Sequence, residues 1–233
     1  GFDTDRSHGS LLRFYADYAS PALVDRYEAL DAIVEAAVDQ PGRRVLVEYV
    51  SANSTGPLHV RLGRHAAFGA TLANLLDATG HKVHREYYVN DAGRQMEILA
   101  VSVWLRYLEC FGEQFPFPSN GYRGDYLHHI SDKLVEQVGR TLVRPAAEVF
   151  RDLPPDAPAG DKDVYIDAVI ARARDLLGED AFHKAFDIAL KDILADIRQD
   201  LEEFGVRYDE WFSERSLSDG GAIDRALARL RSN

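Results

Sequence analysis

The most restrictive feature of the sequence is the order of its apolar segments between residues 44 and 110. RVLVEYV is short, β-branched and nearly continuous in apolar residues, which indicates a buried strand. A Gly-Pro loop, a helix closed by Gly80, a second strand and a second helix follow. This order, with short connections, predicts a parallel sheet with a right-handed crossover. The four elements are expected at residues 44–50, from 59 or 63 to 78, 84–89 and 94–110. The first helix carries several apolar side chains on one side, namely Phe68, Leu72, Leu75 and Leu76.

Residues 111–233 show a different pattern, which predicts a mainly helical insertion. Residues 111–123 are rich in Pro, Gly and aromatic residues, as expected of a loop, and residues 154–162 form a Pro- and Asp-rich linker. The clearest helix has apolar side chains at steps of three and four, which place them on one face. They are Phe182, Phe186, Leu190, Ile193, Ile197 and Leu201. Helices are expected near residues 125–138, 145–150, 164–177 and 181–204.

The sequence therefore divides into three parts with an α/β fold at the centre. Residues 1–43 form an N-terminal segment that is mostly helical, with helices expected at 11–18 and 23–38. Residues 44–110 form the α/β part, and residues 111–233 form the helical insertion.

Composition narrows the class of protein. Hydrophobic residues make up 46% and charged residues 28% of the 233 residues, which fits a globular chain. The net charge of −11 gives no overall attraction to nucleic acid, although a local basic groove can still bind it. No apolar run approaches the ~20 residues that span a bilayer. Cys110 is the only cysteine, which favours a reducing, cytoplasmic location. Adjacent residues on a helix point in different directions, so His128 and His129 predict no metal site.

The loop after Val50 is the expected place for chemistry. In open parallel sheets, ligands bind beyond the carboxyl ends of the strands. Gly56 and Gly63 permit close approach to the backbone, and His59 lies where a donor could meet a phosphate. These residues alone leave two interpretations open, a phosphate-binding loop and an ordinary strand-to-helix turn with a surface histidine.

Several long motifs in this order resemble arginyl-tRNA synthetases. VEYVSANSTGPLHVRLGR is similar to the family's VEFVSANPTGPLHVGHGR, and REYYVNDAGRQMEILAVSVWLRYLE is similar to the segment that follows it. GYRGDYL, VRPAAEVF and DIRQDLEEFGVRYDEWFSERSL resemble the family's helical insertion. The resemblance covers roughly residues 44–230 and implies the first half of the Rossmann-like domain of a class I aminoacyl-tRNA synthetase, followed by that insertion.

The resemblance also implies substrates and site residues. Enzymes of this family join arginine to ATP as an adenylate, with Mg²⁺ accompanying the ATP, and pass the arginine to the 3′ end of its tRNA. Glu48, Ser51 and Asn53 match the arginine-binding positions, where charge-assisted hydrogen bonds would hold the cationic substrate. Gly56, His59 and Gly63 match the nucleotide-binding positions, and His59 would be catalytic by stabilising charge on the transferring phosphate. No resident metal is expected.

Three positions of the nucleotide signature depart from the family. Arg61 stands where the family has glycine, so its long side chain is expected to obstruct the nucleotide. Leu62 stands where the family has its second histidine, and loss of such a donor typically costs about 10²–10³ in rate. Ser54 replaces a proline and should only loosen the loop. The lysine-rich loop of the family's second Rossmann half does not occur before Asn233.

We expect the chain to be a portion of an arginine–tRNA ligase catalytic domain that is inactive by itself. The alternative is a non-catalytic paralogue of the family that acts as a binding or regulatory module, which Arg61 and Leu62 favour. An exposed apolar edge and face of the half-sheet should be covered by other residues.

Overall fold

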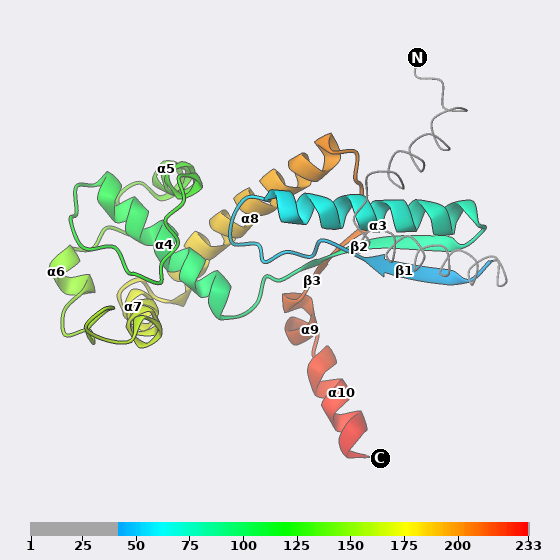
Figure 1. Ribbon diagram of the computed structural model, residues 1–233. Helices are drawn as coiled ribbons and strands as arrows, with labels where there is room; N and C mark the ends of the chain where they lie inside the picture. The colour runs from blue at the N-terminus through cyan, green and yellow to red at the C-terminus, as the bar shows by residue number, and fades with distance from the viewer. Residues whose placement is uncertain (1–41, 233) are drawn as a thin grey trace.

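The computed structural model describes residues 42–232. The helices expected at 11–18 and 23–38 lie outside the described residues, as does nearly all of the segment 1–43. Figure 1 shows a small sheet beneath the long helix α3, with a helical body beside it and two short helices leading away to the C-terminus.

Three parallel strands form the sheet, in the order β1-β2-β3. They are β1 (Arg44–Glu48), β2 (Lys82–Val89) and β3 (Glu210–Ser213). The parallel pairing of β1 with β2 confirms the strand–helix–strand unit predicted from the sequence. The third strand was not predicted, because EWFS is only four residues long and follows a long helical block.

The prediction that the first strand is buried is wrong. Strand β1 ends at Glu48, and its residues alternate between half-buried and exposed, with Leu46 58% exposed. The reason is its position, because β1 is an edge strand of the described sheet and α3 packs on only one of its faces. Glu48 is therefore exposed rather than enclosed in an apolar strand.

Helix α3 (Val60–Ala78) covers the sheet with small residues. Its buried residues are Ala66, Gly69, Ala73 and Leu76, whereas Phe68 is 49% exposed and Leu75 36% exposed. A Cβ atom on Gly69 would lie 2.2 Å from Cγ of Tyr49, so the glycine is what lets the helix approach the tyrosine ring. Gly80 (φ 89°) ends the helix, as predicted, with the His81 amide donating to the Leu76 carbonyl at 3.1 Å.

Helix α4 (Arg94–Cys110) has the predicted bounds and is the centre of the core. Eleven of its residues are buried, which requires neighbours on most sides. It packs against three helices of the insertion, and Trp104 Nε1 donates to the Leu142 carbonyl at 2.9 Å. The buried polar end of this tryptophan is thereby satisfied.

Four helices lie near the positions predicted for the helices of the insertion. They are α5 (Tyr126–Val138), α6 (Ala146–Val149), α7 (Lys162–Leu177) and α8 (Glu179–Glu203). All six apolar residues predicted to share one face of the last helix are buried in α8. Salt bridges tie the insertion to α4, with Arg94 reaching Asp167 at 2.7 Å and Arg174 reaching Glu97 at 2.6 Å.

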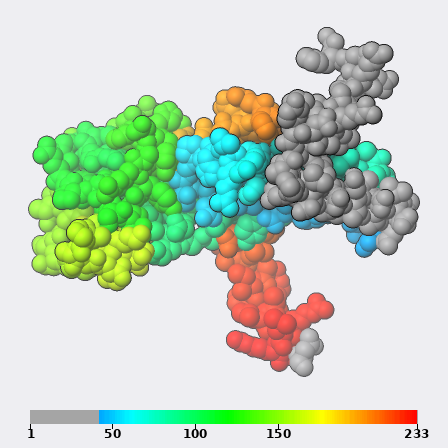
Figure 2. All heavy atoms as spheres, in the orientation of Figure 1, coloured from blue at the N-terminus to red at the C-terminus, as the bar shows by residue number. Residues whose placement is uncertain are grey.

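Two short helices, α9 (Arg215–Asp219) and α10 (Ala222–Arg231), follow β3 and contain no buried residues. In Figure 2 they stand away from the rest of the molecule. Three apolar residues of α10 are exposed, namely Ile223, Leu227 and Leu230. Within residues 42–232, no helix is long and apolar enough to cross a membrane.

Candidate functional site

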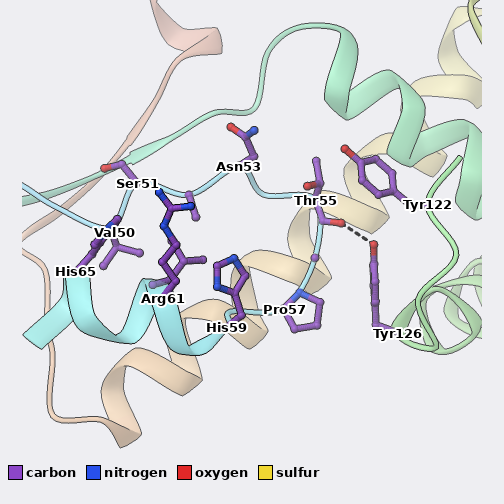
Figure 3. Close-up of a pocket in the computed structure, with 13 residues that line it drawn as sticks. Val50, Ser51, Asn53, Thr55, Pro57, His59, Arg61, His65, Tyr122 and Tyr126 are labelled. Carbon is purple, nitrogen blue, oxygen red and sulfur yellow. Dashed lines mark hydrogen bonds between the residues drawn. The ribbon is translucent and has the colours of Figure 1, made fainter. Parts of the chain in front are cut away.

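A pocket of about 590 Å³ opens where β1 ends and α3 begins. Its walls are the loop after β1, the first turns of α3, and two tyrosines of the insertion, Tyr122 and Tyr126 (Figure 3). The pocket thus lies at the carboxyl edge of the parallel sheet, where such folds bind ligands.

A tight turn directs the chain into the pocket. Val50 has φ 66° and Ser51 has φ 38°, and the Ser51 amide donates to the Tyr49 carbonyl at 3.0 Å. A positive φ is costly for a β-branched residue such as valine, by about 1–3 kcal/mol. Strain of this kind persists only where the surrounding structure fixes it, and it concentrates at functional sites.

Hydrogen bonds to the second strand hold the loop after this turn. Ser51 Oγ accepts from the Tyr88 amide at 3.1 Å, and the Ala52 amide donates to Tyr87 Oη at 3.2 Å. Burial raises the pKa of Tyr87 to about 12, against a lowering by its hydrogen bond to Ala52. Among residues 42–232, the Ser51 oxygen only accepts a hydrogen bond, so its hydroxyl proton can donate to a ligand.

Asn53 lies at the mouth of the pocket and contacts the end of the second strand. It forms an isolated parallel bridge with Asn90, whose Nδ2 donates to Asn53 Oδ1 at 3.0 Å. With the Asn90 amide turned over, its nitrogen instead donates to Glu214 Oε2 at 2.9 Å. Asn53 is exposed, so its amide can reach a ligand.

Asp91, next to Asn90, has a structural role. It is buried, its Oδ2 accepts from Ser213 Oγ at 2.6 Å, and its Oδ1 accepts from the Arg215 amide at 2.9 Å. These bonds fix the end of β3 to the end of β2. Asp91 does not line the pocket.

The far wall comes from the insertion. Tyr126 Oη donates to the Thr55 carbonyl at 2.6 Å, and burial raises the pKa of Tyr126 to about 12. A Cβ atom on Gly56 would lie 3.3 Å from this hydroxyl. The glycine therefore allows the Tyr126 ring of the insertion to pack closely against the loop.

The near wall is the start of α3, and its charged side chains are basic. His59 is the N-cap residue and is exposed, and Arg61 and His65 follow on the helix. Figure 3 shows Arg61 extending from the first turn of α3 toward the loop at Ser51 and Asn53. Leu62 also lines the pocket, so both departures from the family signature lie in this wall.

The structure brings together four of the residues singled out from the sequence and separates two. Ser51, Asn53, Gly56 and His59 line the pocket. Gly63 does not line it, and nothing lies within 4 Å of a Cβ atom placed there. Glu48 is also absent from the lining, because alternation along β1 turns Tyr49 toward α3 and Glu48 toward the opposite face.

Sequence reasoning missed His65, Tyr122 and Tyr126. His65 follows Arg61 by four residues and therefore lies on the same side of the helix. This spacing could have indicated His65 once the start of the helix was known. The two tyrosines belong to the GYRGDYL motif, but their distance of about 70 residues along the chain from the loop gave no indication of contact.

Negative charge gathers on the other side of the strand ends. Burial is the main cause of the raised pKa of Tyr88, and the carboxylates of Glu214, Glu48 and Asp91 raise it further. The site is therefore polarised, with basic groups on α3 and carboxylates beyond the ends of the strands.

Outside the pocket, one group in the described part of the chain has ligand atoms close enough to hold a metal ion. His84, Glu86 and Glu210 place these atoms within 4.8 Å of one another on the sheet, and His84 Nε2 lies 3.0 Å from Glu210 Oε2.

Comparison with known proteins defines the class. The family described as tRNA synthetases class I (R), catalytic domain, matches residues 30–112, which include β1, the pocket loop, α3, β2 and α4. A crystal structure assigned to an arginyl-tRNA synthetase from Campylobacter jejuni superposes with a TM-score of 0.60 and 29% identity, over 87% of this chain and 39% of that one. The fold is thus that of a class I aminoacyl-tRNA synthetase catalytic domain.

Curated relatives identify the family. The arginine–tRNA ligase of Thioalkalivibrio sulfidiphilus is 59% identical over 191 residues, which are 82% of this chain and 33% of the relative. The arginine–tRNA ligase of Legionella pneumophila (strain Corby) is 56% identical over 81% of this chain and 32% of the relative. The chain belongs to the arginyl-tRNA synthetase family, as a portion of its catalytic domain. It spans about a third of the length of these relatives.

Proposed function

We propose that this chain forms the arginine- and ATP-binding start of an arginine–tRNA ligase catalytic domain. In this reaction the arginine carboxylate attacks the α-phosphate of ATP, pyrophosphate leaves, and the arginyl group then passes to the 3′ end of its tRNA. The observation that carries the proposal is the pocket at the carboxyl edge of the sheet, lined by Ser51, Asn53, Gly56 and His59. Residues 44–110 and strand β3 would supply the first half of the nucleotide fold, and helices α5 to α8 the insertion.

The arginine subsite is proposed at the edge of the pocket that faces the strand ends. The exposed amide of Asn53 and the free hydroxyl proton of Ser51 can both hydrogen-bond to the substrate backbone. Glu48 does not line the pocket, so its proposed role is that of a nearby negative charge for the cationic substrate. Glu48 contributes to the raised pKa of Tyr88, after burial and Glu214, and this supports the role.

The nucleotide subsite is proposed along the start of α3. His59 lines the pocket and is exposed, so its ring can donate to a phosphate oxygen in the transition state. Gly56 lies beside it in the loop. Gly63 belongs to α3 but does not line the pocket, so we propose that it lies near the nucleotide without contacting it. Mg²⁺ would enter with ATP as part of the substrate.

Arginine binding tests the proposal. In calorimetry with the 233-residue chain, we expect weak binding of arginine that Asn53→Ala lowers by about fivefold or more, since one hydrogen bond to a charged group is lost. Asn74→Ala is the matched control, because this exposed asparagine on α3 bonds to Arg85 and lies outside the pocket. Binding that is absent, or that Asn53→Ala leaves unchanged, would contradict the proposed arginine subsite.

A non-catalytic binding or regulatory module is the second candidate, and the presence of Leu62 in the wall favours it. Leucine has no hydrogen-bond donor for a phosphate, and such a loss costs about 3 kcal/mol of transition-state stabilisation. A module of this kind binds arginine without arginine- and tRNA-dependent exchange of pyrophosphate into ATP. Clear exchange activity would eliminate this candidate.

A further inference from the structure

The charged side chains that line the pocket are all potential cations. They are His59, Arg61 and His65, and no aspartate or glutamate occurs among the lining residues. The pocket lining thus differs in the sign of its charge from the chain as a whole, whose net charge is −11. A concave site with one sign of charge and low-dielectric walls concentrates ligands of the opposite sign.

Arg61 has donors available for a ligand. Within the part of the chain that the structure describes, its guanidinium forms no hydrogen bond or ion pair, whereas Arg94 and Arg174 are each held by two carboxylates. Guanidinium presents five N–H donors in a planar fork that fits phosphate oxygens in pairs. In Figure 3 this fork extends over the pocket, with His59 on one side and His65 on the other.

The side chain of Arg61 forms part of the wall and does not fill the pocket. About 590 Å³ stays open with Arg61 in place, which lies within the usual range of ligand pockets. This open volume leaves room for a ligand beside the Arg61 side chain. The same geometry permits Arg61 to contact a phosphate chain that runs along the start of α3.

We propose that Arg61, together with His59 and His65, forms a polyphosphate subsite. In this subsite Arg61 provides the donors that Leu62 lacks. The inference rests on the proposed function, because it places the phosphates of ATP, or free pyrophosphate, along the basic wall. Arg61 and His65 are four residues apart on α3 and so face the same way, which lets a chain of phosphates contact both. A single carboxylate would engage only one of them.

Titration of the 233-residue chain with pyrophosphate, ATP and adenosine tests the subsite. We expect pyrophosphate and ATP to bind and adenosine to bind far more weakly. Arg61→Ala should weaken the binding of both phosphates about tenfold or more, because a charge-assisted pair of hydrogen bonds is lost. The phosphate affinity of Arg61→Lys should fall between those of the unaltered chain and of Arg61→Ala, since lysine keeps the charge but lacks the planar guanidinium. His65→Ala should cause a smaller loss.

Arg64→Ala is the matched control. Arg64 is exposed on the same helix, carries the same charge and does not line the pocket, so its loss should leave pyrophosphate affinity within about twofold. Unchanged helical circular dichroism shows that each variant is folded. Equal losses for Arg61→Ala and Arg64→Ala would mean a general charge effect and overturn the subsite.

Two further outcomes contradict the inference directly. If Arg61→Ala binds ATP as tightly as the unaltered chain, or more tightly, Arg61 is neutral or an obstruction. If adenosine binds as well as ATP, the phosphates contribute nothing. The outcome for arginine is independent. Pyrophosphate binding that depends on Arg61, without arginine binding, supports the subsite and contradicts the proposed function. If arginine binds but Arg61→Ala leaves the pyrophosphate affinity unchanged, the proposed function is supported and the polyphosphate subsite is contradicted.

Discussion

At the scale of single residues, the closeness of α3 to the sheet depends on one glycine. Gly69→Ala would place a Cβ atom 2.2 Å from Cγ of the buried Tyr49, and a rigid ring cannot give way by that amount. We expect the variant to lose about 1–3 kcal/mol of unfolding free energy, as overpacked cores do. Urea unfolding followed by circular dichroism measures the change.

Gly63→Ala in the same helix is the internal comparison for that prediction. A Cβ atom at Gly63 has nothing within 4 Å, so alanine should raise helix stability by about 0.5–1 kcal/mol. The same substitution six residues apart is thus expected to change stability in opposite directions. A loss of stability at Gly63 similar to that at Gly69 would show that helix propensity, rather than contact with Tyr49, decides both results.

At the scale of elements, β3 is held to the sheet by an aromatic cluster. Trp211 stacks on Tyr87 with ring centroids 4.3 Å apart and meets Tyr208 edge-on at 5.4 Å. The guanidinium of Arg198, from α8, lies over the Trp211 ring at 4.6 Å from its centroid. The cluster joins the last helix of the insertion to the second strand. It therefore couples the helical body to the sheet that forms the pocket.

Trp211→Ala should lower the unfolding free energy by about 2 kcal/mol, since a half-buried tryptophan loses these aromatic contacts. It should also speed hydrogen exchange of the backbone amides in β3. Phe212→Ala is the neighbouring control, because Phe212 faces the other side of the sheet and pairs with Tyr88 alone at 5.8 Å. We expect it to cost about half as much, and the reverse order would show that β3 is anchored from its other face.

The elements that could be predicted from sequence are those with long periodic patterns. Helix α4 was predicted to the residue because eleven buried side chains give it an uninterrupted pattern between Gly93 and Gly112. Strand β3 was missed because four residues carry too little periodicity, and its partner β2 lies more than 120 residues earlier. Packing that depends on distant residues is not visible in a local pattern.

The sequence predicts where the pocket lies, and only part of its lining. The loop after β1 had to lie at the carboxyl edge of the sheet, which placed Ser51, Asn53 and His59 together. Glu48 was placed there by resemblance, yet strand alternation turns it away from the pocket. Closure of Tyr126 over Gly56 depends on tertiary packing, as does the left-handed turn at Val50.

At the scale of the whole molecule, the pocket lies where two bodies meet. Figure 1 shows α8 running from the insertion back toward the sheet, and Tyr208, just after it, donates from its hydroxyl to the Tyr49 carbonyl at 3.2 Å. The sheet supplies the loop and α3, while the insertion supplies Tyr122 and Tyr126. Apolar residues stay exposed on the described surface, including Leu46 on β1 and Phe68 on α3.

We propose that this pocket receives both arginine and ATP, and nuclear magnetic resonance tests this proposal most directly. In the ¹⁵N-labelled chain, titration with arginine and with ATP should shift the amide signals of residues 50–65 and of Tyr122 and Tyr126. Arginine should act mainly on Ser51 and Asn53, and ATP mainly on His59, Arg61 and His65. Shifts confined to other parts of the chain, or none at millimolar ligand, would contradict the account.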